Sequence, residues 1–289
     1  MKYIYLDTSS INYLNDNLRH DEMTKWKKLI ESQFDGQIVF SPISLFEILN
    51  SNTERKDELI YTCQLLFDER LLPVPSTILD KYVAQGCPLV EIGKLDFDSW
   101  NLLNGVWRDV AGDLEKTILV ENIQNTYEYS KMLKALINGT LCNYNNKTGI
   151  AINEFIDSIS PIMEVENDFE KVSLFFIIII LLVGALPFDS AGEFWHKRDI
   201  SCMTGKFEYI AKHCKPLLYR GPIAAMAMMA IHQVQSGKST RGLFNDCLHL
   251  GYTAYCSTMI SNDEHFMQVS EKIKQYINCE FVSIKMRTQ

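Results

Sequence analysis

The stretch Tyr3-Ile4-Tyr5-Leu6-Asp7-Thr8-Ser9-Ser10 decides the fold, because its character changes at Asp7. The first four residues are apolar or aromatic, and from Ile11 onward apolar residues recur at helical spacing, which predicts a strand, a polar turn and a helix. A second unit follows, in which residues 38–40 predict a strand and Ser41-Pro42 predict the N-cap and first residue of a helix. Two such units within 50 residues indicate a parallel sheet.

The strand and helix pattern returns near the end of the chain. Residues 258–261 and 281–284 predict two short strands, and residues 265–276 predict the helix between them. Another helix is expected over residues 245–255. We therefore expect an α/β fold, a three-layer α/β/α sandwich with a mostly parallel central sheet.

The middle of the chain differs, since strand signals are few and apolar residues recur at helical spacing. We expect residues 55–215 to be a large all-helical insertion between two parts of the α/β domain, residues 1–54 and 216–289. The most apolar run, residues 172–188, has 17 residues without a charge, whereas a membrane-spanning helix needs about 20. Pro187 and the flanking acids further favour a helix buried inside the protein over a membrane-associated one.

Composition and charge narrow the class of protein. The 289 residues are 47% hydrophobic and 22% charged, which suits a globular protein and excludes a disordered chain. The net charge of −8 excludes a general basic coat for nucleic acid, although residues 197–241 carry a local excess of Lys and Arg. This excess of positive charge is either a surface that binds the phosphates of a nucleic acid or a chance grouping of solvent-exposed side chains. The cysteines have no zinc-finger spacing and the N-terminal stretch does not resemble a signal peptide, so we expect reduced thiols in a cytoplasmic protein.

Four acids fall where a parallel sheet would bring them to one edge. Asp7 ends the first strand, and Asp263 follows the strand at residues 258–261. Glu47 lies in the first turns of the helix after the second strand, and Asp246 opens a later helix. Ligand sites of parallel sheets collect at the carboxyl ends of the strands. Clustered carboxylates stay ionised when a cation such as Mg²⁺ or Mn²⁺ neutralises them, so the four acids are candidates for a metal site.

Each acid also has a purely structural interpretation. Asp7, Asp246 and Asp263 are suited to capping a helix or a turn. Glu47 follows Ser44 by three positions and so fits a capping box. Taken one at a time, capping is the more common role, and the case for chemistry rests on the four acids together.

Four segments of the chain resemble those of PIN-domain nucleases, namely residues 5–9, 40–49, 245–250 and 259–266. In that family a strand ends in Asp followed by a small hydroxyl residue, and a helix then supplies a Glu. A later helix begins near an Asp, and a strand ends in Thr/Ser-x-Asp. The chain departs from the family at Ser257, where some relatives carry a further Asp, and in the large insertion, which compact members lack.

The resemblance implies metal-dependent hydrolysis of phosphodiester bonds, with Asp7, Glu47, Asp246 and Asp263 as the catalytic residues. Asp7, Asp246 and Asp263 would hold Mg²⁺ or Mn²⁺, and Glu47 would complete the site or orient the attacking water. Further residues are expected to bind a carboxylate or the substrate: Thr8, Ser9, Arg220, Lys238 and Arg241.

RNA is the expected substrate, because many relatives cleave structured or single-stranded RNA. Such a ribonuclease suits a toxin or antiviral effector that an inhibitor or antitoxin protein holds in check, and homo-oligomers are a further expectation. Two alternatives stay open: a DNA nuclease that uses the same site, and a non-catalytic PIN-like scaffold whose helical insertion binds other proteins. Binding of a divalent ion would distinguish a nuclease from a scaffold.

Overall fold

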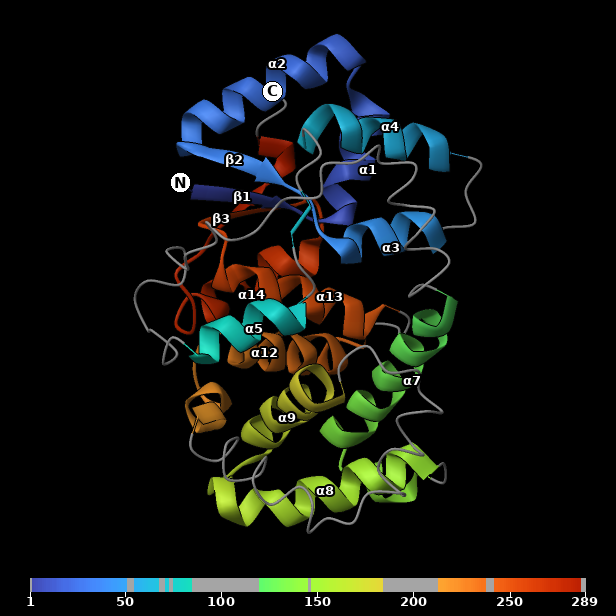
Figure 1. The fold of residues 1–289 in the computed structure, drawn as a ribbon, viewed down its shortest axis with the longest axis vertical. Coiled ribbons are helices and arrows are strands. Elements are labelled where there is room, and N and C mark those ends of the chain that lie inside the picture. The colour runs from blue at the N-terminus through green and yellow to red at the C-terminus, as the bar shows by residue number, and fades with distance from the viewer. Residues whose placement is uncertain are drawn as a thin grey trace.

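Figure 1 shows the protein as a computed structural model. It describes residues 2–50, 55–67, 71–72, 75–84, 120–144, 147–183, 213–237 and 242–286. Lys238 and Arg241, two of the expected substrate-binding residues, therefore lie outside the described residues.

A four-stranded parallel sheet in the order β2-β1-β3-β4 lies at the centre of the fold. Its strands are β1 (Lys2–Leu6), β2 (Gly36–Val39), β3 (Thr258–Ser261) and β4 (Glu280–Ser283). Tyr5 pairs with Val39, and Leu6 pairs with Ile260, so both ends of the chain build one sheet. The expectation of an α/β fold with a parallel sheet is confirmed.

Helices pack on both faces of the sheet. On one face Ile4, Leu6 and Ile38 join a buried cluster with helices α1 (Thr8–Asn17), α2 (His20–Phe34) and α4 (Lys56–Phe67). Figure 1 shows these three helices together on one side. Successive strand residues point to opposite faces, so Tyr5 belongs to the cluster on the other face. The sheet is thus the middle layer of a helix–sheet–helix arrangement.

The second face carries more helices than the first. They are α5 (Pro75–Ala84), α7 (Val120–Ile137), α8 (Lys147–Met163), α9 (Asp168–Ile177), α12 (Gly221–Gln235), α13 (Leu243–His249) and α14 (Glu264–Ile273). Helix α3 (Pro42–Asn50) follows β2. Shorter 3₁₀ segments span Leu141–Asn143, Lys215–Leu218, Leu250–Ala254 and Ile284–Met286. The helix expected over residues 245–255 is therefore wrong in its extent: α13 ends at His249, and a 3₁₀ turn follows that contains Gly251, where a Cβ would lie 2.9 Å from the Met226 methyl carbon.

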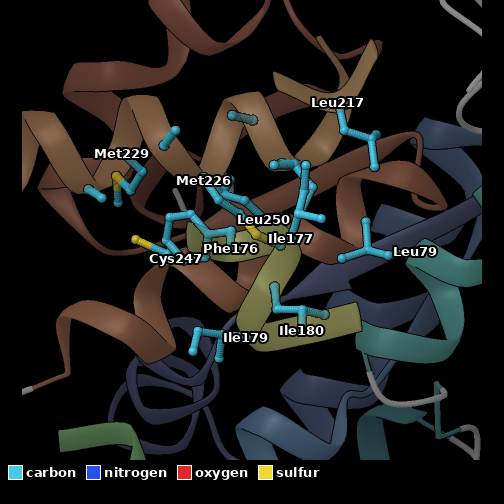
Figure 2. Close-up of a cluster of buried hydrophobic side chains, with 14 of the residues drawn as sticks. Leu79, Phe176, Ile177, Ile179, Ile180, Leu217, Met226, Met229, Cys247 and Leu250 are labelled. Carbon is cyan, nitrogen blue, oxygen red and sulfur yellow. The ribbon is translucent and has the colours of Figure 1, made fainter. Parts of the chain in front are cut away.

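The described part of residues 55–215 is helical, apart from an isolated bridge between Phe40 and Leu71. Residues 172–180 are buried throughout, and α9 continues as a π-helical turn over Ile178–Val183. Figure 2 shows Phe176 and Ile177 of this segment among side chains of α12 and α13. The expected buried helix is confirmed over 172–180, and residues 184–188 lie outside the described residues.

One hydrophobic cluster joins the sheet face to α5, α7, α8, α9 and α12. The described helices of residues 55–215 thus share a core with the α/β part, while the domain boundaries stay a prediction. In the described part of the chain no helix has the length and apolarity to cross a membrane. The six cysteines in that part are free thiols.

Candidate functional site

Asp7 directly follows β1 and caps the N-terminus of α1, where its Oδ1 accepts from the Ser10 backbone N–H at 2.8 Å. Its Oδ2 accepts from the Ser261 hydroxyl at 2.5 Å, and the Ser9 hydroxyl lies within 2.9 Å of both oxygens. The Ser10 side chain also acts on this carboxylate, so protein donors satisfy much of its hydrogen-bonding capacity.

Burial dominates the electrostatics of Asp7, which is 2% exposed. Removal from water raises the pKa of this carboxyl above its usual value, although the Ser261 hydroxyl, the charge of His249 and Ser10 all lower it. The ionised form of Asp7 is therefore costly in this structure, and a nearby cation would stabilise it.

Glu47 is positioned by α3, whose N-terminus is capped as expected: the Ser44 N–H donates to the Ser41 hydroxyl at 3.0 Å. The carboxylate of Glu47 accepts from the Thr8 hydroxyl, and its Oε2 lies 3.1 Å from Nε2 of His249. Burial raises the pKa of Glu47, but the charge and hydrogen bond of His249 and the Thr8 hydroxyl lower it overall. Glu47 is thus held as a carboxylate at the end of β1.

His249 contacts Glu47 directly, and no role for it was expected from the sequence. Its ring is buried between Glu47 and the Tyr5 hydroxyl, which contacts Nδ1. Burial lowers the pKa of His249, but the negative charges of Glu47, Asp7 and Asp246 raise it above its usual value. The signal that would have found it is its spacing, since residues three apart share one face of a helix and His249 follows Asp246 by three.

Asp246 lies in the first turn of α13, after Gly242 at the N-cap. The expectation that Asp246 caps this helix is wrong, because the helix begins at Leu243. Oδ2 of Asp246 accepts from Nε2 of Gln233 at 3.0 Å. Gln233 is fully buried, and its Oε1 has no hydrogen-bond partner in the described part of the chain.

Asp263 caps α14, where its Oδ1 accepts from the His265 N–H at 2.6 Å. Its own backbone N–H donates to the Ser261 hydroxyl at 2.9 Å, and that hydroxyl donates to Asp7. The ends of β1 and β3 are therefore joined through one serine. Asp7 and Asp263 lie just after the ends of strands and Glu47 lies in the helix that follows β2, whereas Asp246 lies in α13, which follows another helix.

The expected substrate-binding residues are placed differently. Thr8 and Ser9 hydrogen-bond the carboxylates of Glu47 and Asp7. Arg220 caps the start of α12, whereas Gln233, which contacts Asp246, is near the end of that helix. A rise of about 1.5 Å per residue puts these two positions about 20 Å apart. The structure does not bring Arg220 to the acids.

The donor chemistry of the acids fits Mg²⁺ or Mn²⁺, because both ions prefer carboxylate oxygens. The unpartnered Oε1 of Gln233 beside Asp246 adds to this fit. Within the described ranges, no three His, Cys, Asp or Glu side chains are grouped closely enough to hold one ion. No family model, curated protein or solved structure matches the chain.

Proposed function

We propose that the protein is a metal-dependent endonuclease that hydrolyses phosphodiester bonds, with RNA as its substrate. One observation carries the proposal: the Asp7 carboxylate at the carboxyl end of β1 accepts from Ser261 at the end of β3, and the next residue, Thr8, donates to Glu47, which lies 3.1 Å from the buried ring of His249. The carboxyl ends of parallel strands are where ligand sites of such sheets form. Membership of the PIN-like family is part of the proposal and rests on the four sequence segments.

The residues have distinct roles in this proposal. Asp7, Asp246 and Asp263 would hold Mg²⁺ or Mn²⁺, which supplies positive charge for the phosphate and lowers the pKa of bound water. Glu47, kept ionised by His249 and Thr8, is placed to accept a proton from the attacking water. Water adds across the P–O3′ bond, which leaves a 5′-phosphate and a 3′-hydroxyl.

RNA is proposed over DNA on the family resemblance alone, and a DNA nuclease would use the same acids. The same resemblance supports a role as a toxin or antiviral effector in the cytoplasm, controlled by an inhibitor protein. Lys238 and Arg241 precede Asp246 in the chain and are proposed to bind the phosphate backbone.

A non-catalytic scaffold is the second candidate, and a specific observation favours it. Asp7 and Asp263 both cap helices, so protein donors already satisfy much of their hydrogen-bonding capacity. A scaffold of this kind would keep the acids for stability and bind no divalent ion.

Cleavage of labelled single-stranded RNA and single-stranded DNA with Mn²⁺, Mg²⁺ or EDTA tests the proposal. The wild type is compared with Asp7→Asn and with the control Asp168→Asn, which changes an exposed acid in the first turn of α9. We expect RNA cleavage that needs metal, is lost in Asp7→Asn and persists in Asp168→Asn. Cleavage of DNA alone would change the substrate and keep the site.

Absence of cleavage is interpreted through Mn²⁺ binding measured by calorimetry. Binding without cleavage would indicate a narrower substrate, such as a folded RNA. Neither cleavage nor binding would favour the scaffold.

A further inference from the structure

His249 is held from both sides of its ring. Nε2 lies 3.1 Å from Oε2 of Glu47, and Nδ1 contacts the hydroxyl of Tyr5. An imidazole has only two ring nitrogens, so each nitrogen of His249 is committed to one partner. The ring cannot turn without breaking both contacts, which fixes its position relative to Glu47.

Tyr5, on the Nδ1 side of the His249 ring, is itself fixed by its neighbours. Tyr5 belongs to the inner strand β1, is 1% exposed, and stacks on Tyr252 with ring centroids 5.0 Å apart. Its hydroxyl also lies 2.8 Å from the hydroxyl of Ser41, which is the N-cap of α3. The hydrogen-bonded chain Ser41–Tyr5–His249–Glu47 therefore begins and ends on α3, and it ties that helix to β1 and α13.

Of these four hydrogen-bonded residues, Glu47 is the one with a catalytic role in the proposed function. Ser41, Tyr5 and His249 are all buried, whereas Glu47 is partly exposed at the edge of the sheet. A carboxylate keeps one orientation when its hydrogen-bond donor is itself fixed by buried residues, and catalytic groups depend on such support. The hydrogen-bonded series of Ser41, Tyr5 and His249 therefore sets the orientation of the Glu47 carboxylate.

We propose that His249, held between Tyr5 and Glu47, is a positioning residue of the nuclease reaction that orients the Glu47 carboxylate. This inference rests on the proposed function. His249 touches neither substrate nor the reacting atoms in the proposal, and it acts through Glu47. Tyr5 and Ser41 support the ring from behind.

A purely structural role is the competing explanation, and the two make different predictions for the pH profile of cleavage. If His249 acts through Glu47, removing its charge lets the pKa of Glu47 rise, so the acidic limb of the profile moves to higher pH. A structural role lowers the amount of folded protein and leaves the limb in place.

The experiment measures kcat and KM for cleavage of labelled single-stranded RNA with Mn²⁺ between pH 5 and 9. It compares full-length wild type, His249→Leu and His249→Gln. His249→Leu is expected to lower kcat about 10–100-fold with KM little changed, as for loss of a supporting hydrogen bond at a catalytic group. His249→Gln keeps an Nε2 donor toward Glu47 and loses the charge. It should retain more of the rate than His249→Leu and still shift the acidic limb upward.

His20→Leu is the matched control, because His20 contacts the Tyr61 ring and begins α2, which packs on the opposite face of the sheet from Tyr5. Its acidic limb should coincide with that of the wild type. Unchanged limbs in both His249 variants, with active wild type, would overturn the positioning role and leave the nuclease proposal standing. A wild type that neither cleaves RNA or DNA nor binds Mn²⁺ would overturn both proposals, and His249→Gln carries the test if His249→Leu does not fold.

Discussion

The hydroxyl of Ser261 donates a hydrogen bond of 2.5 Å to Oδ2 of Asp7, across 254 positions of the chain. Asp7 directly follows β1 and Ser261 ends β3, so the bond joins the carboxyl ends of two neighbouring strands. The same serine accepts from the backbone of Asp263. The edge of the sheet that carries the acids is thereby held as one unit.

Replacing Ser261 by Ala should destabilise the protein by about 1.5–3 kcal/mol, the range for a hydrogen bond to a charged group. The loss leaves the buried Asp7 carboxylate with one donor fewer. Urea unfolding followed by circular dichroism measures the change. Ser158→Ala is the control, because Ser158 is exposed and donates only to the carbonyl of Phe155. Equal effects of the two substitutions would contradict the role assigned to Ser261.

Asp7→Asn should change how stability depends on pH. Burial raises the pKa of Asp7 in the folded state above the ordinary value of 3.8, which applies to the unfolded state. At pH values between these two pKa values, the folded state binds more protons than the unfolded state. The unfolding free energy of the wild type therefore falls as pH rises through that window. Asn does not titrate and still caps a helix well.

The difference in unfolding free energy, variant minus wild type, should thus grow as pH rises above 3.8 and level off above the raised pKa of Asp7. Urea denaturation at a series of pH values from 4 to 8 measures it. A difference that stays constant over this range would show that Asp7 has an ordinary pKa.

Gly221→Ala should cost more than Gly237→Ala, although both glycines have φ of +75°. The left-handed backbone costs either alanine about 1–2 kcal/mol. A Cβ at Gly237 meets nothing within 4 Å, whereas a Cβ at Gly221 would lie 2.7 Å from the Tyr82 hydroxyl oxygen. Tyr82 is fully buried, so overpacking should add about 1–3 kcal/mol. Thermal unfolding of the two variants measures this difference, and equal melting temperatures would rule out the close contact.

Phe176→Ala should destabilise the protein by about 3–5 kcal/mol, because it opens a cavity in the core around α9. Figure 2 shows the ring of Phe176 within that cluster. Ile162→Ala, at an exposed position of α8, should change stability by no more than about 0.5 kcal/mol. Urea unfolding measures both. A small effect of Phe176→Ala would contradict close packing of α9 against its neighbours.

Much of the α/β part could be predicted because its signals are local. The change from β-favouring residues to helical spacing at Asp7 gives β1 and α1, and Ser41-Pro42 gives the start of α3. The run of apolar residues at 172–180 predicts burial of α9 for the same reason. Each of these elements is specified by residues adjacent in the chain.

What could not be predicted depends on residues that are distant in the chain. The strand order β2-β1-β3-β4 is set by packing over the whole fold. His249 acquires its role from Tyr5 and Glu47, which lie 244 and 202 positions away. Arg220 was expected to bind the substrate beside the acids, but the length of α12 separates it from Asp246. Local propensity carries no information on such contacts.

The place of β1 inside the sheet has a consequence for the newly synthesised chain. β1 can pair with β2 early in synthesis, but its other neighbour, β3, begins 219 positions after Val39. Because synthesis adds about 5–20 residues per second, one edge of β1 stays unpaired for about 10–45 seconds. Asp246, His249 and Asp263 arrive in the same late segment, so Asp7 and Glu47 emerge long before the groups that surround them. If the protein is a nuclease, an unfinished chain is inert toward RNA, and its first cut follows the last strand pairing.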